Sequence, residues 1–291
     1  MQVIITMAGK GTRFSDLGFT EPKPIVLVGG KPAIQYLVDE FPSDWKIIFA
    51  VGRHFQNTSI EKVLRNIRPH GEIIFCDYSA RGPIDTVKAA LSKIDLAAQV
   101  LVSYCDYSLI WNPEKFFSAV SGYDAAVVTY HGFHPTYFGP NSYCHVKVSG
   151  SEIVQLQEKK LFTENIESEM TSVGLYYFKS GELLVEALEQ QEIQNLKYKT
   201  EFYTSLAIQA LISVKPNLKI LNYSVDQIIQ FGTPSDIERF EFWNHVIVMK
   251  KAMSDFKFIN IDPKNQPTNF DSCIFEKEKF YWQKVLSPKN A

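Results

Sequence analysis

The chain contains 291 residues, 45% of them hydrophobic, as expected for a folded protein with one large or two small domains. Lys and Arg total 30 and Asp and Glu total 32, a formal net charge of -2 without the basic excess of a nucleic-acid-binding surface. The four scattered cysteines favour reduced thiols over a zinc site or a disulfide framework. No apolar run reaches membrane-helix length and no signal sequence precedes the first predicted strand, so we expect a cytoplasmic protein that binds neither nucleic acid nor membrane.

The first predicted element is a buried parallel strand within residues 1–9, where consecutive β-branched residues occur. It leads into a turn with Gly9 and Gly11, whose missing side chains allow backbone N–H groups to approach an anion. The dinucleotide fingerprint is excluded because Phe14 replaces its third glycine. A Walker P-loop is excluded because Pro32 stands where that motif requires Ser or Thr.

Basic side chains follow this turn. Lys10, Arg13 and Lys23 supply the positive charge that a triphosphate needs. Pro22 and Pro24 stiffen the backbone on either side of Lys23. Strand, glycine turn and basic residues together predict a cradle for a nucleoside triphosphate, and the alternative is a glycine-rich connection beside a solvated basic cluster.

Strand and helix patterns alternate from residue 46 to residue 130, which predicts a parallel sheet with helices on both faces. In chain order, the predicted elements are a strand at 46–51, a helix at 56–68, a strand at 72–76, a helix at 83–94, a strand at 99–104, a helix at 112–120 and a strand at 124–130.

The pattern changes after residue 130, where two strand-like segments flank Ser149-Gly150-Ser151 and predict a hairpin. The later predicted elements are strands at 171–178, 218–223 and 227–231 and helices at 180–191, 201–212 and 233–242. Beyond residue 243 the periodicity weakens. We therefore predict a single domain at 1–243 and a tail or extension at 244–291 that packs on the core or on a partner subunit.

An acidic residue follows the strand at 99–104. Asp106 stands at the carboxyl end of this apolar strand, where open α/β sheets bind their ligands. Chemistry at a triphosphate needs a divalent cation, and Mg²⁺ prefers hard oxygen ligands. Asp106 is therefore the best single candidate for a metal ligand, with a turn-capping carboxylate as the alternative.

Several motifs resemble, in order, those of the nucleotidyltransferases that make sugar nucleotides, the NDP-sugar pyrophosphorylases. The first is the glycine turn with Thr12-Arg13, followed by Pro22-Lys23-Pro24, and the second is the Asp after the strand. The later ones are Glu158-Lys159 after the hairpin, the Gly174 strand and Gly232-Thr233-Pro234-Ser235-Asp236. This resemblance covers about residues 1 to 240.

The resemblance implies an α/β fold, a three-layer α/β/α sandwich with a mixed, mainly parallel central sheet. It also implies a Mg²⁺-dependent nucleotidyltransferase that condenses an NTP with a sugar 1-phosphate, giving an NDP-sugar and pyrophosphate, for surface polysaccharide biosynthesis. Its partners are then the NTP and a phosphorylated small-molecule acceptor, with a homo-oligomer as a possible assembly.

The resemblance also assigns roles to individual residues. Catalytic residues are Arg13, Lys23 and Asp106; nucleotide-binding residues are Ala8, Gly9, Gly11, Thr12, Arg81, Gly82 and Thr86; acceptor-binding residues are Glu158, Lys159 and Gly174.

Two departures from the family pattern affect the metal site. Cys105 precedes Asp106 where the family has glycine or another small residue. Gln230 occupies the place of a second metal-ligating Asp, and an amide is a weaker Mg²⁺ ligand than a carboxylate. Either Asp226 takes that role together with Asp106, or Asp106 and the phosphates hold the ion alone.

Two other functions remain open from sequence. A cytidylyltransferase for a phosphorylated alcohol such as phosphocholine shares the N-terminal motifs. It would need an aromatic cage for the quaternary ammonium, with candidates Tyr107, Trp111, Tyr137, Phe138, Tyr176 and Tyr177. A catalytically silent nucleotide-binding regulatory protein is the other alternative.

Overall fold

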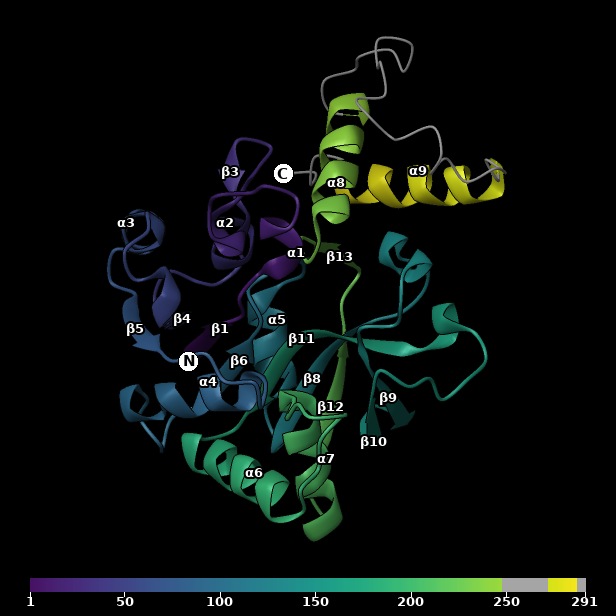
Figure 1. Cartoon of the computed structure of the whole chain (residues 1–291). Helices are drawn as coiled ribbons and strands as arrows, with labels where there is room; N and C mark the ends of the chain where they lie inside the picture. The colour runs from purple at the N-terminus through teal and green to yellow at the C-terminus, as the bar shows by residue number, and fades with distance from the viewer. Residues whose placement is uncertain (248–271, 287–291) are drawn as a thin grey trace.

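The computed structural model describes residues 1–247 and 272–286, and its centre is a nine-stranded sheet ordered β5-β4-β1-β6-β11-β8-β12-β10-β9 (Figure 1). Its strands are β1 (Gln2–Met7), β4 (Lys46–Gly52), β5 (Glu72–Cys76), β6 (Val100–Ser103), β8 (Ala125–Tyr130), β9 (Cys144–Ser149), β10 (Glu152–Glu158), β11 (Met170–Phe178) and β12 (Ile220–Ser224). Strands β5, β4, β1 and β6 pair in parallel, as do β8 and β12, whereas β10 and β11 run against their neighbours. The predicted mixed, mainly parallel sheet is confirmed.

Successive side chains of a strand point to opposite faces of the sheet, and in β1 they divide the core in two. Val3 and Ile5 pack on the face covered by α2 (Ala33–Val38), α3 (Ile60–Ile67) and α5 (Pro113–Ala119). Ile4 packs on the face covered by α4 (Pro83–Ala90), α6 (Gly181–Ile193) and α7 (Thr204–Val214). Helices cover both faces, which confirms the predicted α/β/α sandwich.

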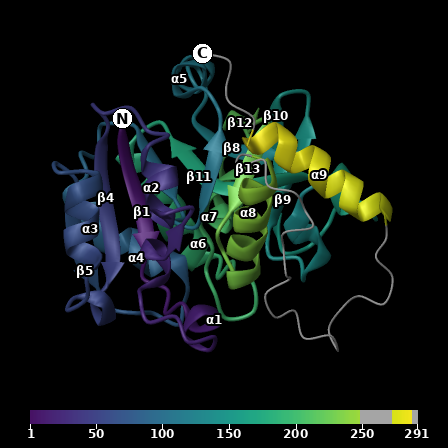
Figure 2. The same cartoon turned by 90° about the horizontal axis from the view of Figure 1, so that it is seen from above.

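A smaller group of elements lies beyond the carboxyl end of β6. Strands β7 (Tyr107–Ile110) and β13 (Gln227–Gln230) form an antiparallel pair. A third apolar cluster joins β13, the short hairpin of β2 (Leu27–Val28) and β3 (Lys31–Pro32), α8 (Pro234–Ile247) and α9 (Ser272–Leu286). Figure 2 shows α8 and α9 packed together on one side of the molecule. None of the described helices is long and apolar enough to cross a membrane.

Most predicted elements are present, with shifted ends. The helix predicted at 201–212 begins at Thr204, because Glu201 instead forms a bridge with Tyr198. Within the helix predicted at 83–94, residues Pro83–Ala90 are α-helical and residues Leu91–Lys93 form a 3-10 turn. The prediction contained no counterpart of α1 (Thr12–Ser15), α2, the two strands of the β2–β3 hairpin, β7 or α9.

The region after residue 243 also differs from the predicted unpatterned tail. Helix α8 continues to Ile247, and residues 272–286 form α9, which packs on the core through Tyr281, Trp282 and Val285. The other residues predicted in the tail, 248–271 and 287–291, lie outside the described part of the chain. A domain boundary at 243 stays a prediction.

Candidate active site

The glycine turn after β1 has the open backbone that the sequence predicts. Gly11 adopts a left-handed φ of 66°, and a Cβ there would lie 3.2 Å from the Cβ of Lys23. A Cβ on Gly9 would meet nothing within 4 Å, so this backbone borders open space. Both glycines line a cavity of about 280 Å³. The turn therefore provides room for a ligand beside exposed backbone groups.

Lys23 and Asp106 form the centre of the site. The Lys23 Nζ lies 2.6 Å from the Asp106 Oδ2, and the two side chains are 19% and 29% exposed. Burial alone would lower the pKa of Lys23, but the Asp106 carboxylate beside it gives a net rise, so the ammonium stays charged. Asp106 follows β6 and is fixed by a hydrogen bond from the Phe231 N–H to its carbonyl, 2.7 Å long.

The cavity beside the glycine turn contains most of the predicted nucleotide residues. Its lining comes from β1, the turn, the loop before α4 and the end of β6: Thr6, Met7, Ala8, Gly9, Gly11, Lys23, Pro24, Tyr78, Ser79, Gly82, Pro83, Thr86, Tyr104, Cys105, Asp106 and Glu201. We call it the nucleotide cavity. Burial raises the pKa of the Cys105 thiol to about 12, so this departure from the family pattern places a neutral thiol in the lining.

Two predicted nucleotide residues do not line this cavity. The backbone groups of Arg81 already have hydrogen-bond partners in the protein. Its N–H donates to the Ser79 hydroxyl, and its carbonyl accepts from the Phe202 N–H. Its guanidinium pairs with Glu192 on α6. Thr12 is exposed in the first turn of α1 and lines neither cavity.

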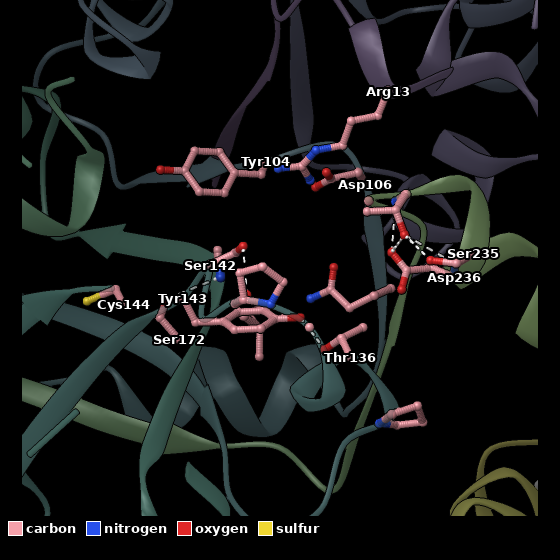
Figure 3. A pocket seen from close by; sticks show the side chains of 18 of the residues that line it. Arg13, Tyr104, Asp106, Thr136, Ser142, Tyr143, Cys144, Ser172, Ser235 and Asp236 are labelled. Carbon is pink, nitrogen blue, oxygen red and sulfur yellow. Dashed lines mark hydrogen bonds between the residues drawn. The ribbon is translucent and has the colours of Figure 1, made fainter. Parts of the chain in front are cut away.

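A second, larger cavity of about 590 Å³ adjoins the first. It is lined by Arg13, Lys23, Tyr104, Asp106, Pro135, Thr136, Gly139, Pro140, Ser142, Tyr143, Cys144, Glu158, Ser172, Val173, Gly174, Tyr176, Tyr203, Gln230, Gly232, Thr233, Ser235, Asp236 and Arg239. Figure 3 shows Tyr104 and Asp106 on one side of it and Tyr143 opposite. Because the predicted acceptor-binding residues Glu158 and Gly174 line it, we call it the acceptor cavity. The two cavities share Lys23, Tyr104 and Asp106.

Glu158 is a buried acid in this lining. It is the last residue of β10, is 7% exposed, and accepts a 2.6 Å hydrogen bond from the Ser205 hydroxyl on α7. Burial raises the pKa of Glu158 to about 7. Its carboxyl group therefore changes charge near neutral pH.

Glu158→Gln is expected to raise the free energy of unfolding at about pH 8, by about 3 kcal/mol. The pKa of Glu158 is higher in the folded than in the unfolded protein, so the folded protein binds the proton more tightly. The stability that this proton contributes is fully present at low pH and is lost as the pH rises through about 7. Gln stays neutral throughout, so the gain should vanish below about pH 4.5. Denaturant unfolding at both pH values measures it, with exposed Glu164→Gln as the control. An equal gain at both pH values would contradict the assignment.

Lys159 lies one layer behind the acceptor cavity. It has a left-handed φ of 55°, and its N–H donates to the Tyr143 carbonyl over 2.8 Å. Its Nζ hydrogen-bonds the hydroxyl of Tyr203, a lining residue, and lies 4.3 Å from the centre of that ring. Lys159 thus does not line the acceptor cavity itself, and its predicted role in acceptor binding stays a prediction.

Gly174 allows an aromatic ring to stand where the two cavities meet. Its φ of 91° is left-handed, and a Cβ there would lie 2.7 Å from the Cδ2 of Tyr104. Strand β11 is irregular here, with a register shift between Ser172 and Tyr176. Any side chain at 174 would therefore displace the Tyr104 ring.

The structure does not bring Asp226 to Asp106. Asp226 is exposed ahead of β13, whereas Gln230 at the other end of that strand pairs with Tyr107, the residue after Asp106. A different carboxylate, that of Asp236, lies near Asp106. Both Oδ2 atoms lie 3.5 Å from the position that a Cβ on Gly232 would take.

Asp236 is also held by its own helix. It accepts hydrogen bonds of 2.7 and 2.8 Å from the N–H and hydroxyl of Thr233, which forms a capping box at the start of α8. Burial, with a smaller contribution from Asp106, raises the pKa of Asp236. Across residues 1–247 and 272–286, no three His, Cys, Asp or Glu side chains form a ready metal cluster. A cation here would need oxygen ligands from a bound substrate as well.

The chain is similar in sequence to known proteins. Residues 3–160, just over half of the chain, match the MobA-like NTP transferase domain. The Bifunctional protein GlmU of Methanocaldococcus jannaschii is 28% identical over 195 residues, which are 66% of this chain and 43% of that protein. The chain thus spans less than half the length of this relative.

Two solved structures share the fold. The nucleoside-diphosphate-sugar pyrophosphorylase from Vibrio cholerae RC9 superimposes with a TM-score of 0.68 at 21% identity, covering 82% of this chain and 99% of that one. The inositol-1-phosphate CTP transferase from T. maritima gives 0.62 at 13% identity, covering 81% and 90%. The similarity to the sugar-nucleotide-forming nucleotidyltransferases that the motifs predict is confirmed at the level of fold and family.

Proposed function

The chain belongs to the MobA-like NTP transferase family, and from that premise we propose that it transfers the nucleotidyl group of an NTP to a sugar 1-phosphate. The products are an NDP-sugar, for surface polysaccharide assembly, and pyrophosphate. One observation carries the proposal: the nucleotide and acceptor cavities meet at Lys23, Tyr104 and Asp106. A triphosphate in one cavity and a phosphate in the other would be joined at that boundary.

The reaction needs no protein nucleophile. A phosphate oxygen of the acceptor attacks the α-phosphorus, a new P–O bond forms, and the bond to the bridging oxygen of the β-phosphate breaks as pyrophosphate leaves. Arg13 and Lys23 line the acceptor cavity as cations and would stabilise charge on the α-phosphate during transfer. The chain's main task is then to align the two phosphates.

We propose Mg²⁺ as the cofactor, held by Asp106 and by oxygens of the triphosphate. The donor set fits a hard cation, because the Asp106 and Asp236 carboxylates both lie beside Gly232 and line the same cavity as the Gln230 amide. When bound, the ion would neutralise triphosphate charge and polarise the α-phosphate. Lys23 now occupies one oxygen of Asp106, so substrate binding would have to move this ammonium toward the phosphates.

The residues that line the acceptor cavity favour a sugar phosphate as the acceptor. Glu158 offers a buried carboxyl that accepts hydrogen bonds from hydroxyl groups, and the Gln230 amide can both donate and accept. The tyrosines on two sides of the cavity provide flat apolar surfaces for a sugar ring. We assign Glu158 to acceptor binding and Lys159, through Tyr203, to its support.

One observation favours phosphocholine as a second candidate acceptor. Tyr104, Tyr143, Tyr176 and Tyr203 all line the acceptor cavity, and aromatic rings bind quaternary ammonium groups. Of the aromatic residues predicted for such a cage, Tyr176 lies in the lining. Three others of this set pack in the hydrophobic core, on the sheet face covered by α2, α3 and α5, namely Tyr107, Trp111 and Tyr177. Tyr137 is outside the lining, and the side chain of Phe138 is outside the described part of the chain.

Pyrophosphate release with a panel of acceptors tests the proposal. Each NTP is combined with hexose 1-phosphates, heptose 1-phosphates and phosphocholine, singly and in competition. Turnover with a sugar 1-phosphate, unaffected by phosphocholine, is the expected result. Turnover with phosphocholine while every sugar 1-phosphate stays silent would show that the acceptor assignment is wrong.

A further inference from the structure

Helix α9 lies outside the matched residues 3–160 and outside both cavities, yet it contacts the loop that lines the acceptor cavity. It packs across α8, where the Trp282 ring lies edge-on to Phe240 with centroids 6.0 Å apart (Figures 1 and 2). The loop at 131–143, which we call the acceptor loop, contributes Pro135, Thr136 and Tyr143 to the lining.

The first link from α9 to the acceptor loop is ionic. The Glu278 carboxylate lies 3.6 Å from the guanidinium of Arg239 on α8, and the Glu278 side chain is only 14% exposed. The same Arg239 nitrogen donates a 2.6 Å hydrogen bond to the Pro135 carbonyl. Glu278 also accepts a hydrogen bond of 3.2 Å from the indole of Trp243. The carboxylate therefore holds the arginine that anchors the loop.

The second link runs through a buried histidine. The Tyr281 ring of α9 lies edge-on to His134, with centroids 5.1 Å apart. Burial lowers the pKa of His134 to about 3, so its ring is neutral and Nδ1 can accept from the Thr136 N–H and hydroxyl. The Thr136 hydroxyl in turn hydrogen-bonds the Tyr143 hydroxyl at the cavity wall.

The described lining of the nucleotide cavity differs from that of the acceptor cavity in its relation to α9. The lining of the nucleotide cavity includes no residue of the acceptor loop, α8 or α9 among the described residues. A disturbance at Glu278 should therefore act first on the acceptor cavity, whose lining includes Arg239, Pro135 and Thr136.

We infer that α9 is a positioning element that fixes the acceptor loop and so sets acceptor affinity, with Glu278 and Tyr281 acting through Arg239 and His134. The kinetic part of this inference rests on the proposed function. The structural part, that α9 holds the acceptor loop, does not.

Glu278→Gln tests both parts, because it removes the charge and keeps the shape of the side chain. We expect the acceptor KM to rise about three- to tenfold, with the NTP KM and kcat little changed. The acceptor is whichever phosphate compound of the panel the wild-type protein uses. Glu276→Gln is the matched control, since that side chain is 65% exposed on the same helix.

Hydrogen exchange provides a readout that needs no turnover. Amides of residues 131–143 should exchange faster in Glu278→Gln than in wild type, and those of residues 8–13 should not. Equal exchange at 131–143 in both proteins, or an equal rise of the two KM values, would overturn the inference. A wild-type protein that turns over no acceptor would contradict the proposed function alone, because the exchange result still decides whether α9 holds the loop.

Discussion

Asp106→Asn is expected to reduce nucleotidyl transfer by about 10²- to 10³-fold while leaving the fold intact. The substitution removes the negative charge at the junction of the two cavities and keeps the shape of the side chain. Because the ion pair with Lys23 is partly exposed, its loss should cost no more than about 1 kcal/mol of stability. The large effect should therefore fall on the chemistry.

Rates of pyrophosphate release at saturating Mg²⁺ measure this effect, and thermal unfolding checks the fold. Asp226→Asn is the matched control, since it makes the same chemical change at the exposed carboxylate first considered as a second metal ligand. We expect it to keep full activity. Near wild-type turnover in Asp106→Asn would rule out Asp106 as the metal ligand, and loss of activity in Asp226→Asn would restore the alternative.

Lys23→Ala and Arg13→Ala are expected to lower kcat more than they raise the KM for the NTP. Charge on the α-phosphate changes as the new bond forms, so cations at the cavity junction should matter most in the transition state. For Lys23 we expect a loss of about 10²-fold or more in kcat. Lys23 should show the larger effect, because it lines both cavities whereas Arg13 lines one and is exposed.

Steady-state kinetics with the NTP as the varied substrate separates the two constants. Lys10→Ala is the control, because Lys10 lies over the Tyr78 ring outside both linings. We expect that variant to keep the wild-type kcat and to change no constant other than the KM for the NTP. If Lys23→Ala and Arg13→Ala both weakened NTP affinity with unchanged kcat, the two residues would be binding residues only.

Local sequence predicted the part of the nucleotide cavity that follows β1. A β-branched strand, a glycine turn and a basic residue between two prolines lie within 24 residues, so their meeting needs no long-range contact. Asp106 was predictable for a similar reason, since the end of a buried parallel strand places a side chain at the ligand edge of the sheet. Both predictions depend on one strand and the loop after it.

The acceptor half could not be predicted in the same way, because its residues come together through the tertiary fold. Asp236 and Arg239 belong to α8, and the acceptor loop approaches them from more than a hundred residues earlier in the sequence. Tyr104 was missed because nothing local indicates that its ring packs on Gly174 where the cavities meet. Asp226 was misplaced because nearness in sequence to Gln230 gives no information about the direction of β13.

The sequence of α9 contains a helical pattern of apolar residues that the sequence analysis did not recognise. Phe275, Tyr281, Trp282 and Val285 recur at helical spacing and face α8 and β13. Glu278 interrupts this stripe and obscured the pattern. In the structure that acid faces Arg239 and Trp243, so the interruption reflects a buried polar contact.

An NTP that carries ³²P at the α-phosphate makes the transferred nucleotidyl group itself visible. We expect the label to appear in a product joined to the acceptor, in an amount equal to the pyrophosphate released, and both to disappear in Asp106→Asn. A catalytically silent nucleotide-binding protein would retain the labelled NTP and release it unchanged. That result, with every NTP and every acceptor of the panel present at saturation, would show that the chain is not a nucleotidyltransferase for these substrates.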